Sequence, residues 1–441
     1  MRSKPSHTAA CALLCALALL NFASCVRQNN NNSAQQQPTP TTTATQTPAP
    51  SGSPGPAATG FSLAAPTTGE GNSLREAGLH PSLALNGDED PMVAYLTKEQ
   101  GGPINLCFVA WDRKSGRWTA PVTIDTVSEL FESSPQLQLA RDASNNMLGI
   151  AYHKAPNDVE LATSSDSGAT WQKEKVSAQG VEATDVTSNP ALGMAQGKEY
   201  VSFSAGDKLY FLTRAGTSGP FNSRTAPTLP GTSRPRDAAP ALALDGSGRP
   251  ALAYFLDPQQ DYTMVVAFWR PDDTAAYKVT DSNNQGTDSP YISLAFASDK
   301  PRVAVNMMRN EDNFNTGPTY FIASSDDAKT WGAPVHIAQD GGNAMYGFLS
   351  VAAQAQAGAA IAAPVTGGNE EGTRCGQPKL ARSSELTAWT TCSPDANRSM
   401  NFSARYSSLI FDGKGKLYLA FENAPDSTSS IGRGLVVWRE P

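Results

Sequence analysis

Polar and charged residues gather in seven short stretches of the chain, each directly before a run of apolar residues. Arginine side chains can grip a carboxylate through two parallel hydrogen bonds, and two carboxylates at the right separation can act as acid and base. We therefore predict a site for a polar ligand at Arg75, His80, Glu132, Asp185, Arg236, Asp237, Asp288, Tyr346 and Arg405. In the alternative interpretation, the same side chains pair with one another as a solvated rim.

The apolar runs that must position these residues repeat one pattern: a strand, a turn rich in Gly, Asn or Asp, and a second strand. The clearest copy is RDAAPALALDGSGRPALAYF at 236–255. Six further copies cover residues 80–96, 133–152, 188–204, 288–306, 348–364 and 405–421. The pattern predicts seven β-hairpins at regular spacing.

An aromatic residue opens a later strand in every repeat, at Phe61, Trp118, Trp171, Phe221, Tyr277, Trp331 and Trp389. A period near 50 residues with four short strands per unit is typical of a β-propeller. We predict an all-β, seven-bladed β-propeller with four antiparallel strands per blade. Only one strand follows the last hairpin, so the N-terminal strand near residues 60–66 should complete the last blade and remove the free sheet edges. A pair of β-sandwiches is the alternative.

The stretch SSDSGATW lies between two predicted strands of one unit. A carboxylate can accept the unpaired N–H groups of such a turn, Gly supplies a positive φ, and Trp covers the space between neighbouring strands. The stretch SSDDAKTW at 324–331 repeats the pattern with Ala328 in place of Gly, and KSGRW and SGPF are shorter, eroded copies. We interpret both full stretches as structural fasteners, neither catalytic nor calcium-binding.

The pattern S-x-D-x-G-x-T-W resembles the Asp-box, or BNR, repeat of bacterial sialidases and related propellers. The residues that match it are Ser164, Asp166, Gly168, Thr170, Trp171, Ser324, Asp326, Thr330 and Trp331. The resemblance implies a sialidase-like scaffold. It does not extend to the activity, because the family's R-I-P-like arginine motif has no counterpart at Arg75 and Tyr346 has no identifiable glutamate partner. Sialidases have six blades, whereas the repeats here number seven.

The N-terminus is a targeting segment. Arg2 and Lys4 precede a short apolar run that ends in Phe22-Ala23-Ser24-Cys25, which resembles a bacterial lipoprotein signal with Cys25 as the lipidated residue. Residues 26–58 are rich in Gln, Asn, Thr and Pro and cannot bury enough surface to fold. We predict a signal peptide at 1–24, a lipidated, disordered tether at 25–58 and a propeller at 59–441, anchored to the outer membrane. An ordinary secretory peptide is the alternative.

Composition and cysteine usage narrow the remaining possibilities. A formal net charge of −7 excludes a typical nucleic-acid binder. An exported protein meets an oxidising compartment, in which cysteines form disulfides. We predict a disulfide between Cys375 and Cys392 and a buried thiol at Cys107. No P-loop, H-E-x-x-H or C-x-x-C motif occurs, and DED at 88–90 resembles a calcium loop only faintly. We expect no metal or other cofactor, and a monomer.

These observations predict a lipid-anchored propeller of the cell envelope that binds a glycan or a protein without catalysis. The channel mouth, where the polar stretches enter the innermost strands, is the expected binding site. A divergent exo-sialidase or other glycoside hydrolase or lyase acting at the same mouth is the alternative, and a scaffold in an envelope complex is a third possibility.

Overall fold

The computed structural model describes residues 60–63, 76–98, 102–127, 137–154, 158–177, 186, 188, 190–235, 240–258, 264–282, 291–306, 319–337, 349–364, 378–392, 406–423 and 434–440. All regular elements in these ranges are β-strands. No helix in them is long and apolar enough to cross a membrane.

The strands form seven antiparallel sheets, here called blades 1 to 7 in chain order. Blade 1 contains β2 (Glu76–Leu85), β3 (Pro91–Lys98), β4 (Ile104–Asp112), β5 (Arg117–Trp118) and β6 (Val122–Val127). Blade 2 contains β7 (Leu137–Arg141), β8 (Leu148–Lys154), β9 (Asp158–Ser164) and β10 (Gln172–Lys175). Blade 3 contains β11 (Ala191–Ala195), β12 (Lys198–Ala205), β13 (Lys208–Ala215) and β14 (Asn222–Thr225).

The remaining blades follow the same order of strands. Blade 4 contains β15 (Thr232–Pro235), β16 (Ala241–Leu244), β17 (Pro250–Pro258), β18 (Met264–Trp269) and β19 (Tyr277–Ser282). Blade 5 contains β20 (Ile292–Ala297), β21 (Lys300–Asn306), β22 (Thr319–Ala323) and β23 (Val335–His336). Blade 6 contains β24 (Ser350–Gln354), β25 (Gly358–Pro364), β26 (Pro378–Ser383) and β27 (Thr390–Cys392). Blade 7 contains β28 (Ser407–Phe411), β29 (Leu417–Asn423), β30 (Gly434–Arg439) and β1 (Gly60–Leu63).

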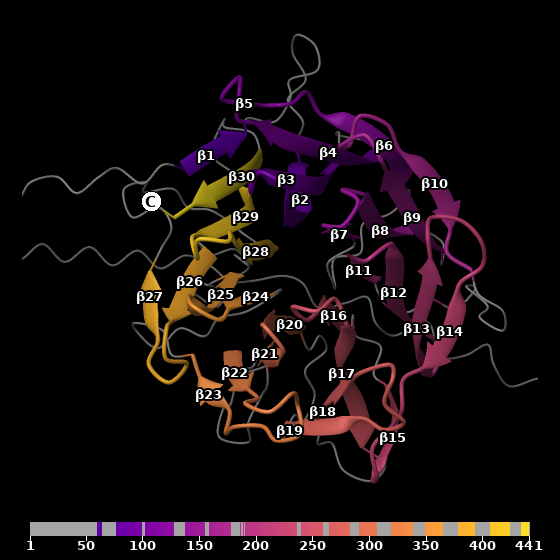
Figure 1. The fold of residues 1–441 in the computed structure, drawn as a ribbon, viewed down its shortest axis with the longest axis vertical. Coiled ribbons are helices and arrows are strands. Elements are labelled where there is room, and N and C mark those ends of the chain that lie inside the picture. The colour runs from indigo at the N-terminus through magenta and orange to yellow at the C-terminus, as the bar shows by residue number, and fades with distance from the viewer. Residues whose placement is uncertain are drawn as a thin grey trace, which may run out of the picture. The chain divides into compact units, whose positions relative to one another are not determined.

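The seven blades form a ring (Figure 1). The innermost strands contact one another in the order β2, β7, β11, β16, β20, β24 and β28, and β28 contacts β2 again. All seven predicted hairpins are present, each formed by the innermost strand and its neighbour. The predicted seven-bladed propeller is confirmed, and the alternative of two β-sandwiches is wrong.

The last blade is closed by the N-terminal strand, as predicted. β1 pairs antiparallel with β30, with Gly60 opposite Trp438 and Leu63 opposite Leu435. Closure in this manner joins the first and last parts of the chain in one sheet and leaves no open ends in the ring.

Hydrogen bonds from side chains to backbone hold the innermost strands of successive blades together. In each bond a Ser or Gln side chain accepts the backbone N–H of a residue in the next blade. The pairs are Ser82 with Leu139, Gln138 with Leu192, Ser293 with Val351, Ser350 with Leu409, and Ser408 with Leu83. An innermost strand has no partner strand on its channel side, so these bonds satisfy amides that the sheet leaves unpaired.

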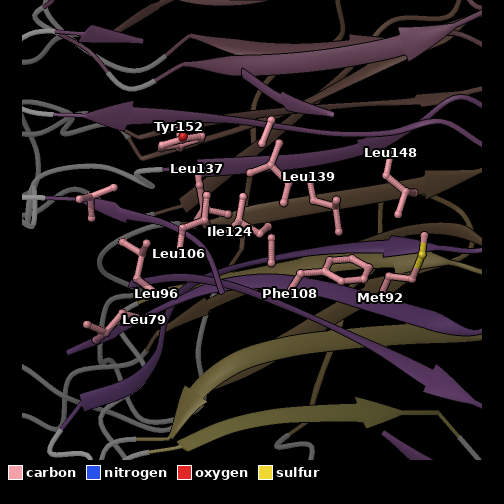
Figure 2. Close-up of a cluster of buried hydrophobic side chains, with 14 of the residues drawn as sticks. Leu79, Met92, Leu96, Leu106, Phe108, Ile124, Leu137, Leu139, Leu148 and Tyr152 are labelled. Atoms are coloured by element: carbon pink, nitrogen blue, oxygen red, sulfur yellow. The ribbon is translucent and has the colours of Figure 1, made fainter. Parts of the chain in front are cut away.

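The core lies between the blades rather than inside any one of them. Figure 2 shows the cluster between blades 1 and 2, in which Leu96, Leu106 and Phe108 of blade 1 face Leu139 and Tyr152 of blade 2. Middle strands such as β17 and β18 are covered on both faces, so their sequences are continuously apolar and do not alternate.

The hairpin turns are capped by a polar side chain at their first residue. The Oδ1 atoms of Asp245 and Asp412 each accept the N–H groups two and four residues further on, and Asn86 does the same. Asp142 accepts Ser144 N–H in its own turn and also the N–H groups of Gln196 and Gly197 in blade 3. Since the turns of neighbouring blades touch in this way, they all lie at one end of the ring.

Candidate functional site

The two ends of the ring are distinguished by the course of the innermost strands. We call the end at which the innermost strands begin the entry end, and the end with the hairpin turns the turn end. In the sequence, the nine predicted ligand residues precede the hairpins or, like His80, fall in their first strand. Of these, His80 is described; the others lie outside the described residues, namely Arg75, Glu132, Asp185, Arg236, Asp237, Asp288, Tyr346 and Arg405.

His80 lies in an irregular part of β2. Leu79 pairs with Leu96 and Ser82 with Ala94, so His80 and Pro81 together oppose one residue of β3. His80 has a φ of 50°, in the left-handed region that non-glycine residues rarely adopt. His80 is 3% exposed, and its ring stacks on Tyr406 with ring centroids 3.7 Å apart. His80 is thus a buried residue that joins blades 1 and 7 at the entry end and supports the surface there.

A close backbone contact lies beside the irregular part of β2. Gly78 has a φ of 76°, and a Cβ atom on it would lie 2.7 Å from Cα of Leu435. Glycine is therefore required where β2 crosses blade 7. Bulges of this kind re-aim side chains and are common next to binding sites.

Blade 4 has the second irregular innermost strand. Pro235 in β15 pairs with Leu256, and Ala241 in β16 pairs with Ala253. Five residues, 236–240, therefore span the place of two on β17. The predicted residues Arg236 and Asp237 fall in this interval, and the ion pair between Arg234 and Asp257, at 3.4 Å, lies directly beside it.

The 164–171 turn lies at the turn end, between β9 and β10. Ser164 Oγ accepts Gly168 N–H at 2.9 Å and donates to Asp166 Oδ1 at 2.8 Å. Asp166 accepts the N–H and the hydroxyl of Thr170, at 2.9 and 2.6 Å. These bonds, the Thr170 hydroxyl first, lower the pKa of Asp166 to about 2. A carboxylate committed in this way holds the turn and has little capacity left for a ligand.

The 324–331 turn in blade 5 repeats the same four hydrogen bonds. Ser324 Oγ accepts Ala328 N–H and donates to Asp326, and Asp326 accepts the N–H and hydroxyl of Thr330. Ala328 takes a φ of 71° where Gly168 has 89°, so the turn keeps its shape without glycine. The pKa of Asp326 is lowered by the same donors, the Thr330 N–H first.

A third turn of related form, which the sequence did not reveal, lies in blade 6. Ser383 Oγ accepts Leu386 N–H at 2.8 Å, and Leu386 has a φ of 67°. Trp389 ends this turn and packs on Phe321 of blade 5. The signal was present as S-S-E-L-T-A-W, but it is one residue shorter than the other two and has Glu385 in place of Asp.

Two arginines at the turn end, Arg214 and Arg113, are paired within the fold. Arg214, with a 3% exposed side chain, contacts Glu199 and Glu174, and its guanidinium lies over the ring of Phe221. Burial raises the pKa of Glu199 despite this partner. Arg113 pairs with Asp90 in blade 1.

A cluster of charged side chains joins blades 1 and 2. Asp125 in β6 accepts the hydroxyl of Tyr152 at 2.7 Å and the ammonium groups of Lys154 and Lys173 at 2.7 and 2.8 Å. Burial alone would raise the pKa of Asp125, but the three donors outweigh it and the pKa is lowered. With all of these groups engaged with one another, the cluster fastens two blades.

The described residues hold no group of three or more His, Cys, Asp or Glu side chains that could bind a metal ion. His153 is buried, and burial lowers its pKa to about 4. Cys107 is a buried free thiol. Cys392 is the last residue of β27, and Cys375 lies outside the described residues, so the disulfide stays a prediction.

No protein-family model and no curated protein matches the sequence. Among solved structures, the Hadza microbial sialidase Hz136 is 11% identical, with 82% of this chain and 65% of that chain covered and a TM-score of 0.46. The fucose-specific lectin from Aleuria aurantia is 13% identical, with 72% and 96% covered and a TM-score of 0.44. The α-L-arabinanase of Penicillium chrysogenum is 12% identical, with 86% and 98% covered and a TM-score of 0.44. These names apply to the matched proteins and not to this chain. The propeller architecture of this chain is established by its own seven sheets.

Proposed function

We propose that this chain is an exported, lipid-anchored propeller of the sialidase-like superfamily that binds a carbohydrate at its channel mouth without catalysis. The mouth lies at the entry end of the ring. The observation that carries the proposal is the irregularity of two innermost strands there, β2 at His80 and the β15–β16 interval at residues 236–240. Strands that bulge at the rim of a channel place side chains where a regular ladder would not.

The structural roles of the charged side chains at the turn end support this proposal. At the turn end, the Asp and Arg side chains described above are engaged in turns and in contacts between blades. We interpret the 164–171 and 324–331 turns as Asp-boxes that fasten the blades. We propose that the predicted ligand residues before the innermost strands are the groups that remain for a ligand, and that a sugar's hydroxyl and carboxylate groups meet their arginine and carboxylate side chains.

The anchor is part of the same proposal and rests on the sequence. Cys25 is the lipidated residue, and residues 26–58 are the tether that separates the propeller from the outer membrane. In a Gram-negative host, the Cys25→Ser variant should move from the membrane fraction to the soluble fraction. Retention of this variant in the membrane would contradict a lipid anchor at Cys25.

Binding is tested with residues 59–441 on an array of glycans that includes sialylated, fucosylated and neutral structures. The variants are Arg236→Ala, which changes a predicted ligand residue, and Arg113→Ala at the turn end, where Arg113 has a 64% exposed side chain. We expect binding that Arg236→Ala reduces roughly tenfold or more and Arg113→Ala leaves unchanged, since a charge-assisted hydrogen bond is lost only at the mouth.

A fluorogenic sialoside is offered to the same three proteins. Turnover that disappears in Arg236→Ala would replace the binding proposal with a sialidase-like hydrolase. Absence of both glycan binding and turnover would contradict a carbohydrate function and favour an envelope protein as the partner.

A further inference from the structure

The chain enters the propeller at the turn end of blade 7. β1 is the first described strand after residues 25–58, and it is the outermost strand of its blade. Its first residue, Gly60, lies opposite Trp438 of β30, which lies opposite Leu419 of β29. β29 begins at Leu417, directly after the hairpin turn of this blade. A chain that is anchored ahead of Gly60 is therefore attached at the outer rim of the turn end.

Exposed basic side chains gather at the same end in blades 7 and 1. The turn between β4 and β5 has the sequence D-R-K-S-G-R, in which Arg113, Lys114 and Arg117 are exposed. The hairpin turn of blade 7 carries Lys414, which is exposed, and Lys416, which is half-buried. We call these five residues the basic patch. They form a local excess of positive charge in a chain whose formal net charge is −7.

Hydrogen bonds and an ion pair connect the two parts of the basic patch. Glu89, in the hairpin turn of blade 1, accepts Gly413 N–H through Oε1 at 2.8 Å, and its backbone oxygen accepts the Tyr418 hydroxyl at 3.3 Å. Arg113 pairs with Asp90, at the end of the same hairpin turn, at 2.8 Å. The blade 1 hairpin thus contacts both basic turns. Figure 1 shows β1 and β5 on neighbouring parts of the outer rim.

The acidic residues of these turns do not cancel the exposed positive charge. Asp90 and Asp412 are buried, and Glu89 and Asp112 are half-buried. Asp88 is exposed. Against this one exposed carboxylate stand the four exposed cations of the basic patch, so the solvent-facing side chains of these turns carry a net positive charge.

Two tryptophans flank the basic turn of blade 1. Trp111 on β4 and Trp118 on β5 lie opposite each other, both half-buried, with ring centroids 5.6 Å apart. Trp118 also packs on the core cluster between blades 7 and 1. Indole rings beside Lys and Arg side chains are typical of protein surfaces that lie at a membrane–water interface.

We propose that the basic patch rests on the anionic lipid headgroups of the membrane to which the chain is anchored. The turn end of blades 7 and 1 then faces the membrane, and the channel mouth, at the opposite end of the ring, faces away from it. This inference rests on the proposed lipid anchor, which puts residues 25–58 between the membrane and Gly60. Because the tether holds the patch close to the surface, a few weak charge contacts are enough to orient the propeller. The partner is a lipid surface and not a free phosphate, because the exposed cations belong to the turns of two blades.

The test attaches residues 26–441, which contain every described residue, to vesicles through an N-terminal hexahistidine tag and a nickel-chelating lipid. This attachment replaces the lipid at Cys25, so the basic patch is tested whether or not Cys25 is lipidated in the cell. The vesicles consist of phosphatidylcholine alone or of phosphatidylcholine mixed with anionic phosphatidylglycerol. Acylation of lysine side chains, followed by mass spectrometry, measures which of them the vesicle covers.

The expected result is protection of the patch lysines on anionic vesicles. Acylation of Lys114 and Lys414 should be roughly threefold slower or more than on neutral vesicles. High salt should remove the difference, because it screens exposed charges. The internal control is Lys208, an exposed lysine between β12 and β13 at the entry end, which should react equally on both kinds of vesicle.

Two charge-reversal variants sharpen the test. Arg117→Glu should weaken the contact roughly tenfold or more and restore the reactivity of Lys414, whereas Lys208→Glu should leave Lys414 protected. Equal acylation of Lys414 on neutral and anionic vesicles would overturn the proposal. Equal protection of Lys114 and Lys208 would also overturn it, since the propeller would then adsorb without a preferred orientation. Fractionation of the Cys25→Ser variant tests the anchor separately, so failure of the anchor and failure of the basic patch are distinguishable.

Discussion

The 164–171 turn of blade 2 and the 324–331 turn of blade 5 share their hydrogen bonds and differ in their contacts with the preceding blade. In both, a Trp packs on a Phe of that blade: Trp171 on Phe108 at 5.2 Å and Trp331 on Phe268 at 5.6 Å between ring centroids. A Cβ atom on Gly168 would lie 2.1 Å from Phe108, whereas Ala328 fits its site and is fully buried. The hydrogen bonds thus define the turn, and the neighbouring blade decides whether its fifth residue must be glycine.

The largest effect is expected from exchanging these fifth residues. Gly168→Ala adds a methyl group against the buried Phe108 ring and places a Cβ at positive φ, which should cost about 2–4 kcal/mol of unfolding free energy. Ala328→Gly relieves backbone strain but removes a buried methyl group, so its effect should lie within about 1 kcal/mol of zero. Urea denaturation of both variants measures the difference.

The Phe108→Leu substitution provides the control. If the ring causes the cost, the double variant Gly168→Ala, Phe108→Leu should be less destabilised than the sum of its two single variants. Strict additivity would show that the backbone conformation, not the ring, requires glycine.

The next largest change in stability is expected from substitution of the fourth residue of each turn, Asp327 or Ser167. Asp327 in blade 5 pairs with Arg270 and Arg249 of blade 4, while Ser167 occupies the equivalent position in blade 2 and is exposed. Asp327→Ala removes one of two carboxylates from the buried Arg270 and should cost about 1–2 kcal/mol, less than the loss of a sole partner because Asp245 remains at 3.3 Å. Ser167→Ala should change stability by less than about 0.5 kcal/mol. Equal effects in thermal unfolding would show that the ion pair adds nothing to the turn.

A smaller difference should separate the two tryptophans. Trp171 Nε1 donates to the backbone oxygen of Gly168 at 3.0 Å, while the buried Nε1 of Trp331 has no partner among the described residues. Trp171→Phe loses a hydrogen bond that Trp331→Phe does not, so it should cost about 1 kcal/mol more in a denaturation experiment. If Trp331→Phe were the more costly variant, ring packing and not the indole N–H would decide the role of this position.

The sequence predicted the features that repeat, because repeated features have local causes. The strand–turn–strand pattern requires only apolar runs and Asp or Gly at fixed places, and these are visible at 236–255 and its six copies. Closure by β1 followed from counting strands. The 164–171 and 324–331 turns were also predictable from the sequence, since Ser164 and Asp166 form hydrogen bonds with residues within six positions of themselves.

The features that escaped prediction depend on contacts between blades. The need for glycine at position 78 comes from the close approach of Leu435, a residue more than 350 positions away. The contact of Arg214 with Glu174 likewise depends on the side chain that the facing blade presents, and no spacing in the sequence encodes it. Among the nine predicted ligand residues, the structure describes His80, which is buried and stacks on Tyr406.

Acidification should affect the two turns alike if their hydrogen bonds define them. The pKa of Asp166 falls from 3.8 to about 2 on folding, so its contribution to stability is present above pH 3.8 and is lost as the pH falls toward 2. Asp166→Asn should therefore be less stable than the wild type at neutral pH, because the amide nitrogen cannot accept the Thr170 hydroxyl, and the difference should shrink between pH 4 and pH 2. Asp326→Asn should behave in the same direction, since the pKa of Asp326 is also lowered. Urea denaturation across this pH range is the measurement. A gap that narrows for Asp166 and stays constant for Asp326 would mean that the contacts of Asp327 with Arg249 and Arg270, absent from blade 2, dominate the electrostatics of the blade 5 turn.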